Sequence, residues 1–293
     1  MLPTVEAPRR KRLRDGINHI AYSVDGQRYA YADVHMFLVV PWGFSRSLCS
    51  LNEKVRPTER IRDVVFSRDG KSVLVAAGDH VWQFDSETGE EQWRYMPPRV
   101  LGFLIVSPLA LAVADSGLVA ASTDNGQFLV WNADRTLAMK YAANESQMGL
   151  AFAGKTDELV TFEHFAINRY DVGTRRRTVR FELPDKTYGM ALSPDGDFAA
   201  VRTLSHVFVL NAHTGEVLTQ RNVEPGLPLL AFHPTRSMIA IGENYFVSLV
   251  DLDGAPIERV EVEDAEVISL AFHPSGETLA IGRSNHQIQL HQL

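Results

Sequence analysis

A short pattern recurs seven times along this chain of 293 residues. The clearest copies are "AYSVDG" (21–26), "ALSPDG" (191–196) and "AFHPSG" (271–276). The third residue of each copy serves as its reference position, and these positions are Ser23, Ser67, Ala114, Ala153, Ser193, His233 and His273. They are separated by 44, 47, 39, 40, 40 and 40 residues. Self-similarity at this interval is typical of solenoids and propellers, in which each repeat is one small supersecondary unit.

The residues around each reference position predict a hairpin. The residue two places before it is Ala or Val in every copy, and larger apolar residues stand on both sides of that small one. A continuous apolar run of this kind predicts a short strand that is buried on both faces. Asp-Gly pairs follow at 25–26, 69–70 and 195–196, and this dipeptide favours the positive φ angles of a hairpin turn.

Two further strands follow the hairpin in each repeat. "HVWQFD" (80–85) is an example of the third strand, and the more polar "EQWRY" (91–95) is an example of the fourth. Four short strands in about 40 residues indicate one propeller blade. We therefore expect an all-β, single-domain, seven-bladed β-propeller of four-stranded antiparallel blades. The expected blades are 17–52, 60–96, 100–142, 146–183, 187–223, 227–263 and 266–293.

The last repeat ends after its third strand, so its outer strand must come from elsewhere in the chain. An unpaired strand edge invites pairing with other molecules. The segment before residue 17 belongs to no repeat, and we expect residues 5–13 to pair with "HQIQLHQL" (286–293) and close the ring as an N-terminal strand.

The third repeat can be aligned in two ways. With Ala114 as its reference position, "PPRVLGFLIVSP" (97–108) becomes an apolar inserted arm that carries Leu101, Phe103 and Ile105. With Ser107 as the reference position, "GFLIVSP" (102–108) is itself the first strand of the blade. The sequence leaves both alternatives open.

The chain resembles the WD-repeat family over nearly its whole length. The stretch "DSGLVAASTDNGQFLVWN" (115–132) is the most similar, with Trp131 and Asn132 where that family has Trp-Asp. The Gly-His pair that precedes the first strand in typical WD repeats is missing, so the hydrogen-bonded tetrad of that family cannot be complete. The resemblance implies a propeller that binds other proteins.

Composition excludes several other classes of protein. The single cysteine, Cys49, rules out an internal disulfide and a zinc site made of several thiolates. The net charge of −7 argues against a basic nucleic-acid binder, although residues 9–14 and 175–177 are short basic runs. The longest uncharged apolar run, 100–114, is too short to span a bilayer. We expect a soluble cytoplasmic protein without membrane or nucleic-acid partners.

No catalytic, cofactor or metal site is expected. The histidines His80, His206 and His286 occupy one repeat position, but different blades would hold them too far apart for one zinc ion. His233 and His273 are expected to cap the turns that they begin. "FDSETGEEQW" (84–93) is similar to the docking repeat of quinone-dependent propellers, in which the Trp packs between blades, but this chain has only one such copy.

These observations predict a non-catalytic protein-interaction scaffold. The residues five places before the reference positions should lie on one face of the ring, and among them Arg62, Met148 and Tyr188 are of types that interfaces favour. With the arm residues Leu101, Phe103 and Ile105 they form the candidate partner-binding set. Two alternatives are a propeller enzyme with an axial active site, either quinoprotein-like or a hydrolase, and a nucleic-acid-associated subunit that uses the basic N-terminus.

Overall fold

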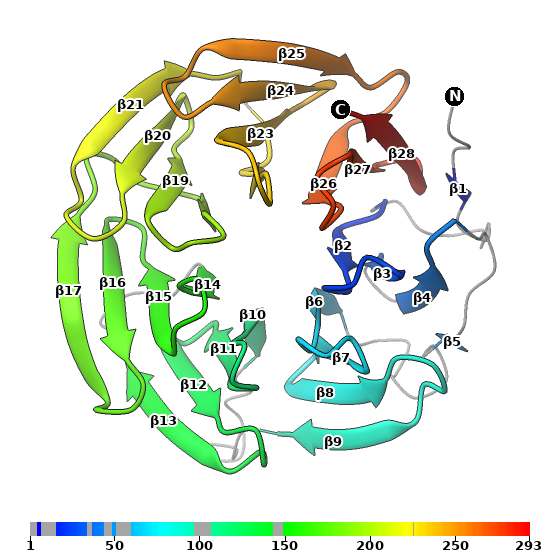
Figure 1. Ribbon diagram of the computed structural model, residues 1–293, viewed down its shortest axis with the longest axis vertical. Helices are drawn as coiled ribbons and strands as arrows, with labels where there is room; N and C mark the ends of the chain where they lie inside the picture. The colour runs from blue at the N-terminus through cyan, green and yellow to red at the C-terminus, as the bar shows by residue number, and fades with distance from the viewer. Residues whose placement is uncertain are drawn as a thin grey trace.

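The fold is a ring of seven four-stranded antiparallel sheets (Figure 1). The computed structural model describes residues 5–6, 16–33, 37–43, 49–50, 60–96, 107–142, 149–224 and 226–293. Their secondary structure is entirely β, which confirms the expected seven-bladed propeller. The described residues contain no helix that could cross a membrane.

Each blade runs from an inner first strand to an outer fourth strand. The first strands are β2 (His19–Tyr22), β6 (Ile61–Phe66), β10 (Pro108–Val113), β14 (Gly149–Phe152), β18 (Gly189–Leu192), β22 (Leu230–Phe232) and β26 (Val267–Phe272). The second strands are β3 (Arg28–Ala32), β7 (Ser72–Ala77), β11 (Val119–Thr123), β15 (Glu158–Phe162), β19 (Phe198–Arg202), β23 (Met238–Glu243) and β27 (Thr278–Arg283).

The third and fourth strands complete the blades. The third strands are β4 (Phe37–Pro41), β8 (His80–Asp85), β12 (Gln127–Trp131), β16 (Ala166–Asp171), β20 (His206–Asn211), β24 (Phe246–Asp251) and β28 (Gln287–Gln292). The outer strands are β5 (Cys49–Ser50), β9 (Glu91–Tyr95), β13 (Leu137–Ala142), β17 (Arg176–Glu182), β21 (Val217–Asn222), β25 (Pro256–Glu261) and, for the seventh blade, β1 (Val5–Glu6).

The second strand of each blade is more buried than the first. Every residue of β7 and of β23 is buried, whereas every residue of β2 and of β22 is only half-buried. The expectation that the first strand is buried on both faces is therefore wrong. First strands form the inner edge of the ring, where one side faces its axis (Figure 1), while second strands are covered by both neighbouring blades.

The ring is closed by the N-terminal strand, as expected. Val5 pairs with Ile288 and Glu6 with Gln287, so β1 is the outer strand of the seventh blade. This register places residue 5 near the start of β28. Residues 7–13, the remainder of the expected strand, lie outside the described residues.

The third blade uses Ala114 as its reference residue. The Ala114 N–H donates to the Leu118 carbonyl at 2.9 Å and the Gly117 N–H donates to the Ala114 carbonyl at 3.0 Å. Ser23 makes the equivalent bonds with Arg28 and Gly26 in the first blade. The alternative alignment on Ser107 is therefore wrong, because the first strand begins at Pro108.

Neighbouring blades are linked through their reference residues. His233 Nδ1 accepts the backbone N–H groups of Thr235 and Arg236 at 3.1 and 2.9 Å, which confirms its expected role as a turn cap. Its Nε2 also lies 2.8 Å from the carbonyl oxygen of Gly276 in the next blade. The sequence did not predict this second contact, since it depends on how two blades stack.

An aromatic contact joins the second and third blades. Trp93 of β9 packs edge-to-face against Trp131 of β12 at a centroid distance of 5.5 Å, and Tyr95 packs against the same ring at 4.8 Å. In the turn before this strand, Asp85 Oδ1 accepts the N–H groups of Glu87 and Thr88 at 2.9 and 2.8 Å. Capping of the turn by Asp85 and packing of Trp93 against the next blade therefore explain the residue pattern of the segment 84–93.

Candidate interaction surface

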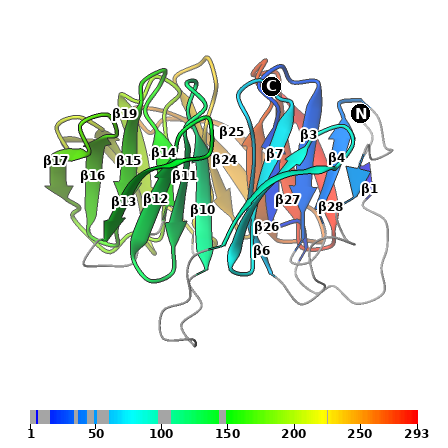
Figure 2. The same cartoon turned by 90° about the horizontal axis from the view of Figure 1, so that it is seen from below.

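One face of the ring carries the loops that lead into the first strands and the turns that join second to third strands. Strand direction alternates within each blade, so these two kinds of connection always fall at the same end of the strands (Figure 2). We call this end the entry face. It contains the residues five places before the reference positions.

The entry face holds two of the predicted partner-binding residues in described positions. Arg62 lies in β6 and Tyr188 directly precedes β18, and both are half-buried. Their blades lie on opposite sides of the ring, so the structure does not bring them together (Figure 1). Met148 and the arm residues, Leu101, Phe103 and Ile105, lie outside the described residues.

Tyr188 belongs to a mixed aromatic and cationic cluster between the fourth and fifth blades. The His164 ring packs edge-to-face against it at 6.0 Å, and Lys186 Nζ lies 5.4 Å from its ring centroid. His164 Nδ1 bonds to the Thr187 carbonyl at 2.9 Å, which joins the turn of the fourth blade to the loop that enters the fifth. Phe165 adjoins His164 at a centroid distance of 6.4 Å.

Large apolar side chains are exposed along the same face from the fourth to the sixth blade. Phe165, Leu204 and Tyr245 are 45%, 70% and 56% exposed, and each lies in the short turn between the second and third strands of its blade. Leu227, which is 47% exposed, lies in the loop that enters the sixth blade. We call these four residues the apolar rim.

The equivalent turns elsewhere are polar in the part of the ring that the structure describes. They contain Gly78 and Asp79 in the second blade, Asp124 and Asn125 in the third, and residues 284–286, Ser-Asn-His, in the seventh. Singly exposed apolar residues are normal on protein surfaces, so the distinguishing feature of the apolar rim is its recurrence in the same turn of three consecutive blades. A large apolar residue in a two-residue turn that recurs in adjacent repeats is a signal that the sequence itself contains.

Two titratable side chains with shifted pKa values, His19 and Asp63, lie close together on first strands at the inner edge of the ring. His19 Nδ1 lies 3.7 Å from Asp63 Oδ1. Burial lowers the pKa of His19 to about 4, with a smaller contribution from Arg60, and burial raises the pKa of Asp63 to about 7. Asp63 accepts the N–H groups of Val64 and Leu111 at 2.8 and 2.7 Å.

The geometry of Asp63 is that of a structural link. Its two carboxylate oxygens each hold a backbone amide, and the bond to Leu111 joins the first strand of the second blade to that of the third. Hydrogen bonds of this kind hold the half-buried carboxyl group in one orientation.

Histidines do not gather into a metal site in the described part of the chain, where no group of three potential ligands is present. His80 lies beside Asp79 and packs against Trp82 at 5.1 Å. His206 bonds to the neighbouring Ser205 hydroxyl through Nδ1 at 2.9 Å. Each of these two histidines therefore has local contacts within its own blade.

The fold and the exposed entry face define a β-propeller with a potential interaction surface. No protein-family model matches the sequence. The chain is similar to a chain in the crystal structure of the mitotic checkpoint complex, with a TM-score of 0.83 and 14% sequence identity over 99% of this chain and 91% of that one. At this level of identity, the similarity shows a shared fold.

Proposed function

We propose that this chain is a non-catalytic scaffold of the WD-repeat type that binds a partner protein through the apolar rim. The observation that carries the proposal is the exposure of one large apolar side chain in each of three consecutive turns, at Phe165, Leu204 and Tyr245. The structural neighbour belongs to a multi-protein complex, which is consistent with this role.

The rim offers part of the apolar surface that a micromolar affinity needs, and further contacts must supply the rest. Burying one large apolar side chain contributes roughly 1.5–3 kcal/mol when it passes from full exposure to full burial. The rim residues are about half exposed, so four of them together contribute on the order of 3–6 kcal/mol. A micromolar complex requires about 8 kcal/mol after the costs of association. The Tyr188 cluster at the same edge would supply polar contacts and a cation.

The proposal is tested by affinity purification from the native host with quantitative mass spectrometry. Leu204→Asp combined with Tyr245→Asp should remove the partner while the protein stays folded, because both side chains point to solvent. Val24→Asp combined with Leu218→Asp is the matched control. These residues are 47% and 45% exposed and lie away from the entry face. Capture of the same partners by the rim variant would contradict the proposed surface.

A further inference from the structure

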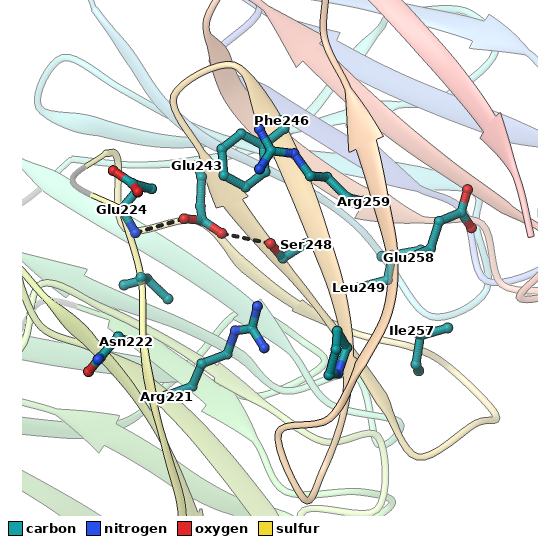
Figure 3. Close-up of a pocket in the computed structure, with 12 residues that line it drawn as sticks. Arg221, Asn222, Glu224, Glu243, Phe246, Ser248, Leu249, Ile257, Glu258 and Arg259 are labelled. Atoms are coloured by element: carbon teal, nitrogen blue, oxygen red, sulfur yellow. Dashed lines mark hydrogen bonds between the residues drawn. The ribbon is translucent and has the colours of Figure 1, made fainter.

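A groove of about 670 Å³ opens on the side of the ring between the fifth and sixth blades (Figure 3). One wall is the end of β21 with the residues that follow it, 221–224, and the other wall is formed by β24 and β25. The upper end of the groove adjoins the entry face, because Phe246 directly follows the rim residue Tyr245.

Three glutamates line the groove, Glu224, Glu243 and Glu258. Glu258 lies 3.1 Å from His291 Nε2, and the buried Glu243 has its partners within the chain. Glu243 is 4% exposed, its Oε1 accepts the Ser248 hydroxyl at 2.7 Å, and its Oε2 accepts the Glu224 N–H at 2.7 Å. These bonds hold the carboxylate in place and tie the sixth blade to the segment that follows the fifth (Figure 3).

Arg221 is the cation of the groove with donors to spare. Its Nη1 donates to the Gly254 carbonyl at 3.1 Å, whereas its Nε is shielded from solvent and has no hydrogen-bond partner. A buried donor without a partner is unfavourable. Because Nε is shielded, the donor that the side chain can offer to a carboxylate oxygen in the groove is Nη2, in an end-on contact. Figure 3 shows this side chain directed into the space between the two walls.

The other cation of the groove has its partners within the chain. The Arg259 guanidinium lies 3.5 Å from the centroid of the Phe246 ring, and its Nε donates to Glu261 Oε1 at 2.6 Å. Beside Arg221, the groove presents the apolar surfaces of Leu249, Pro256 and Ile257, and Ile257 is 55% exposed. One cation with free donors therefore adjoins an apolar wall.

We propose that this groove binds an extended peptide segment of a partner protein, with an Asp or Glu side chain on Arg221 and an apolar neighbour against Ile257. The inference rests on the proposed scaffold function, since the peptide belongs to a protein partner. It adds a second site, because the groove lies on the side of the ring and the apolar rim lies on its entry face.

The test is selection of random 12-residue peptides displayed on phage against the full chain. We expect enriched peptides to share an acidic residue at one fixed position with an apolar residue next to it. A synthetic enriched peptide should lose at least tenfold in affinity for Arg221→Gln, and its Asp→Asn or Glu→Gln form should lose a similar factor with the unchanged protein. The two changes together should cost little more than either alone, because they remove the same contact.

Arg94→Gln is the matched control, since Arg94 lies on the outer strand β9 of another blade and should leave peptide affinity unchanged. Equal thermal unfolding of both variants shows that each is folded. The proposal is overturned if no peptide is enriched, if no acidic position is shared, or if Arg221→Gln binds as well as the unchanged protein.

The two proposals fail separately. If the rim variant loses the co-purified partner but the selected peptides share no acidic position, the proposed scaffold function stands and the proposed peptide site in the groove is wrong. If the selected peptides share an acidic position and bind Arg221→Gln more weakly, but the rim variant still captures the partner, the peptide site in the groove stands and the proposed contact at the rim is wrong.

Discussion

The imidazole Nε2 of His273 donates to the carbonyl oxygen of Gly26 at 3.0 Å and so joins the last blade to the first. Its Nδ1 accepts the Ser275 N–H at 3.2 Å, which leaves the ring proton on Nε2. The same ring packs against Tyr22 at 5.1 Å and Trp42 at 4.7 Å, both in the first blade. The single histidine thus contacts both sides of the junction at which the ring closes.

Replacing His273 by Ala should destabilise the ring by about 1–3 kcal/mol, through loss of a hydrogen bond and of aromatic packing. Urea unfolding measures this change. His213→Ala is the control, because 52% of the His213 side chain is accessible and its ion-pair partner at 3.0 Å, Asp197, is exposed as well. The control should change stability by less than about 0.5 kcal/mol. Equal effects of the two changes would contradict the role of His273 at the junction.

Gly276 should be far less tolerant of Ala than Gly43. Both have positive φ, at 77° and 80°, so both substitutions incur a backbone cost of about 1–2 kcal/mol. A Cβ at Gly276 would overlap the His233 imidazole of the preceding blade, whereas a Cβ at Gly43 would meet no atom within 4 Å. We expect Gly276→Ala to lower the unfolding free energy by clearly more than Gly43→Ala. Similar losses in urea unfolding would show that the blades do not meet as closely as described.

Acidification should destabilise the protein through its buried histidines. Burial lowers the pKa of His233, and burial lowers that of His19 to about 4. In both cases the unfolded chain takes up the proton more readily, near pH 6.5, than the folded protein does. The contribution of His19 to stability is therefore present above pH 6.5 and is lost as the pH falls through 4, and that of His233 is present above pH 6.5 and declines as the pH falls below it.

Asp63 acts with the opposite sign. Burial raises its pKa to about 7, so the stability associated with its neutral form is present below pH 3.8 and is lost as the pH rises through 7. Urea unfolding between pH 4 and 8 separates these contributions. His233→Gln should reduce the loss of unfolding free energy below pH 6.5. Asp63→Asn should reduce the loss of unfolding free energy that occurs as the pH rises toward 7. A His233→Gln profile parallel to that of the unchanged protein would contradict the assignment to His233.

Deletion of residues 1–14 should lower the melting temperature by several degrees. The deletion removes β1, whose residues Val5 and Glu6 pair with Ile288 and Gln287, and leaves the outer edge of β28 open. Each kcal/mol lost corresponds to roughly 2–4 °C in a protein of this size class. A calorimetric scan at fixed protein concentration measures the shift. An unchanged melting temperature would mean that β1 adds nothing to the closure.

The sequence predicted the ring because its information is local and repeated. The small residue two places before each reference position and the Asp-Gly turns recur in register, and they define strands and hairpins without knowledge of the neighbouring blades. Closure by an N-terminal strand followed from the missing outer strand of the last repeat. The choice between Ala114 and Ser107 needed the hydrogen bonds of the turn itself.

Contacts between blades could not be predicted in the same way. The bond from His233 to Gly276 joins residues 43 positions apart, and its geometry depends on the angle between two sheets. The apolar rim depends on side-chain exposure, which the repeat pattern does not specify. Tyr188 lies on the expected face of the ring, and its neighbour His164 belongs to a turn of another blade that only the folded ring brings close.

Hydrogen–deuterium exchange of the purified complex tests most directly whether partners bind the apolar rim. Binding should slow exchange in the three turns at 164–165, 204–205 and 244–245, and in the loop around Leu227, relative to the free protein. The polar turn at Gly78 and Asp79 serves as the internal reference and should exchange equally in both states. Protection confined to other faces, with the three turns unchanged, would contradict the account.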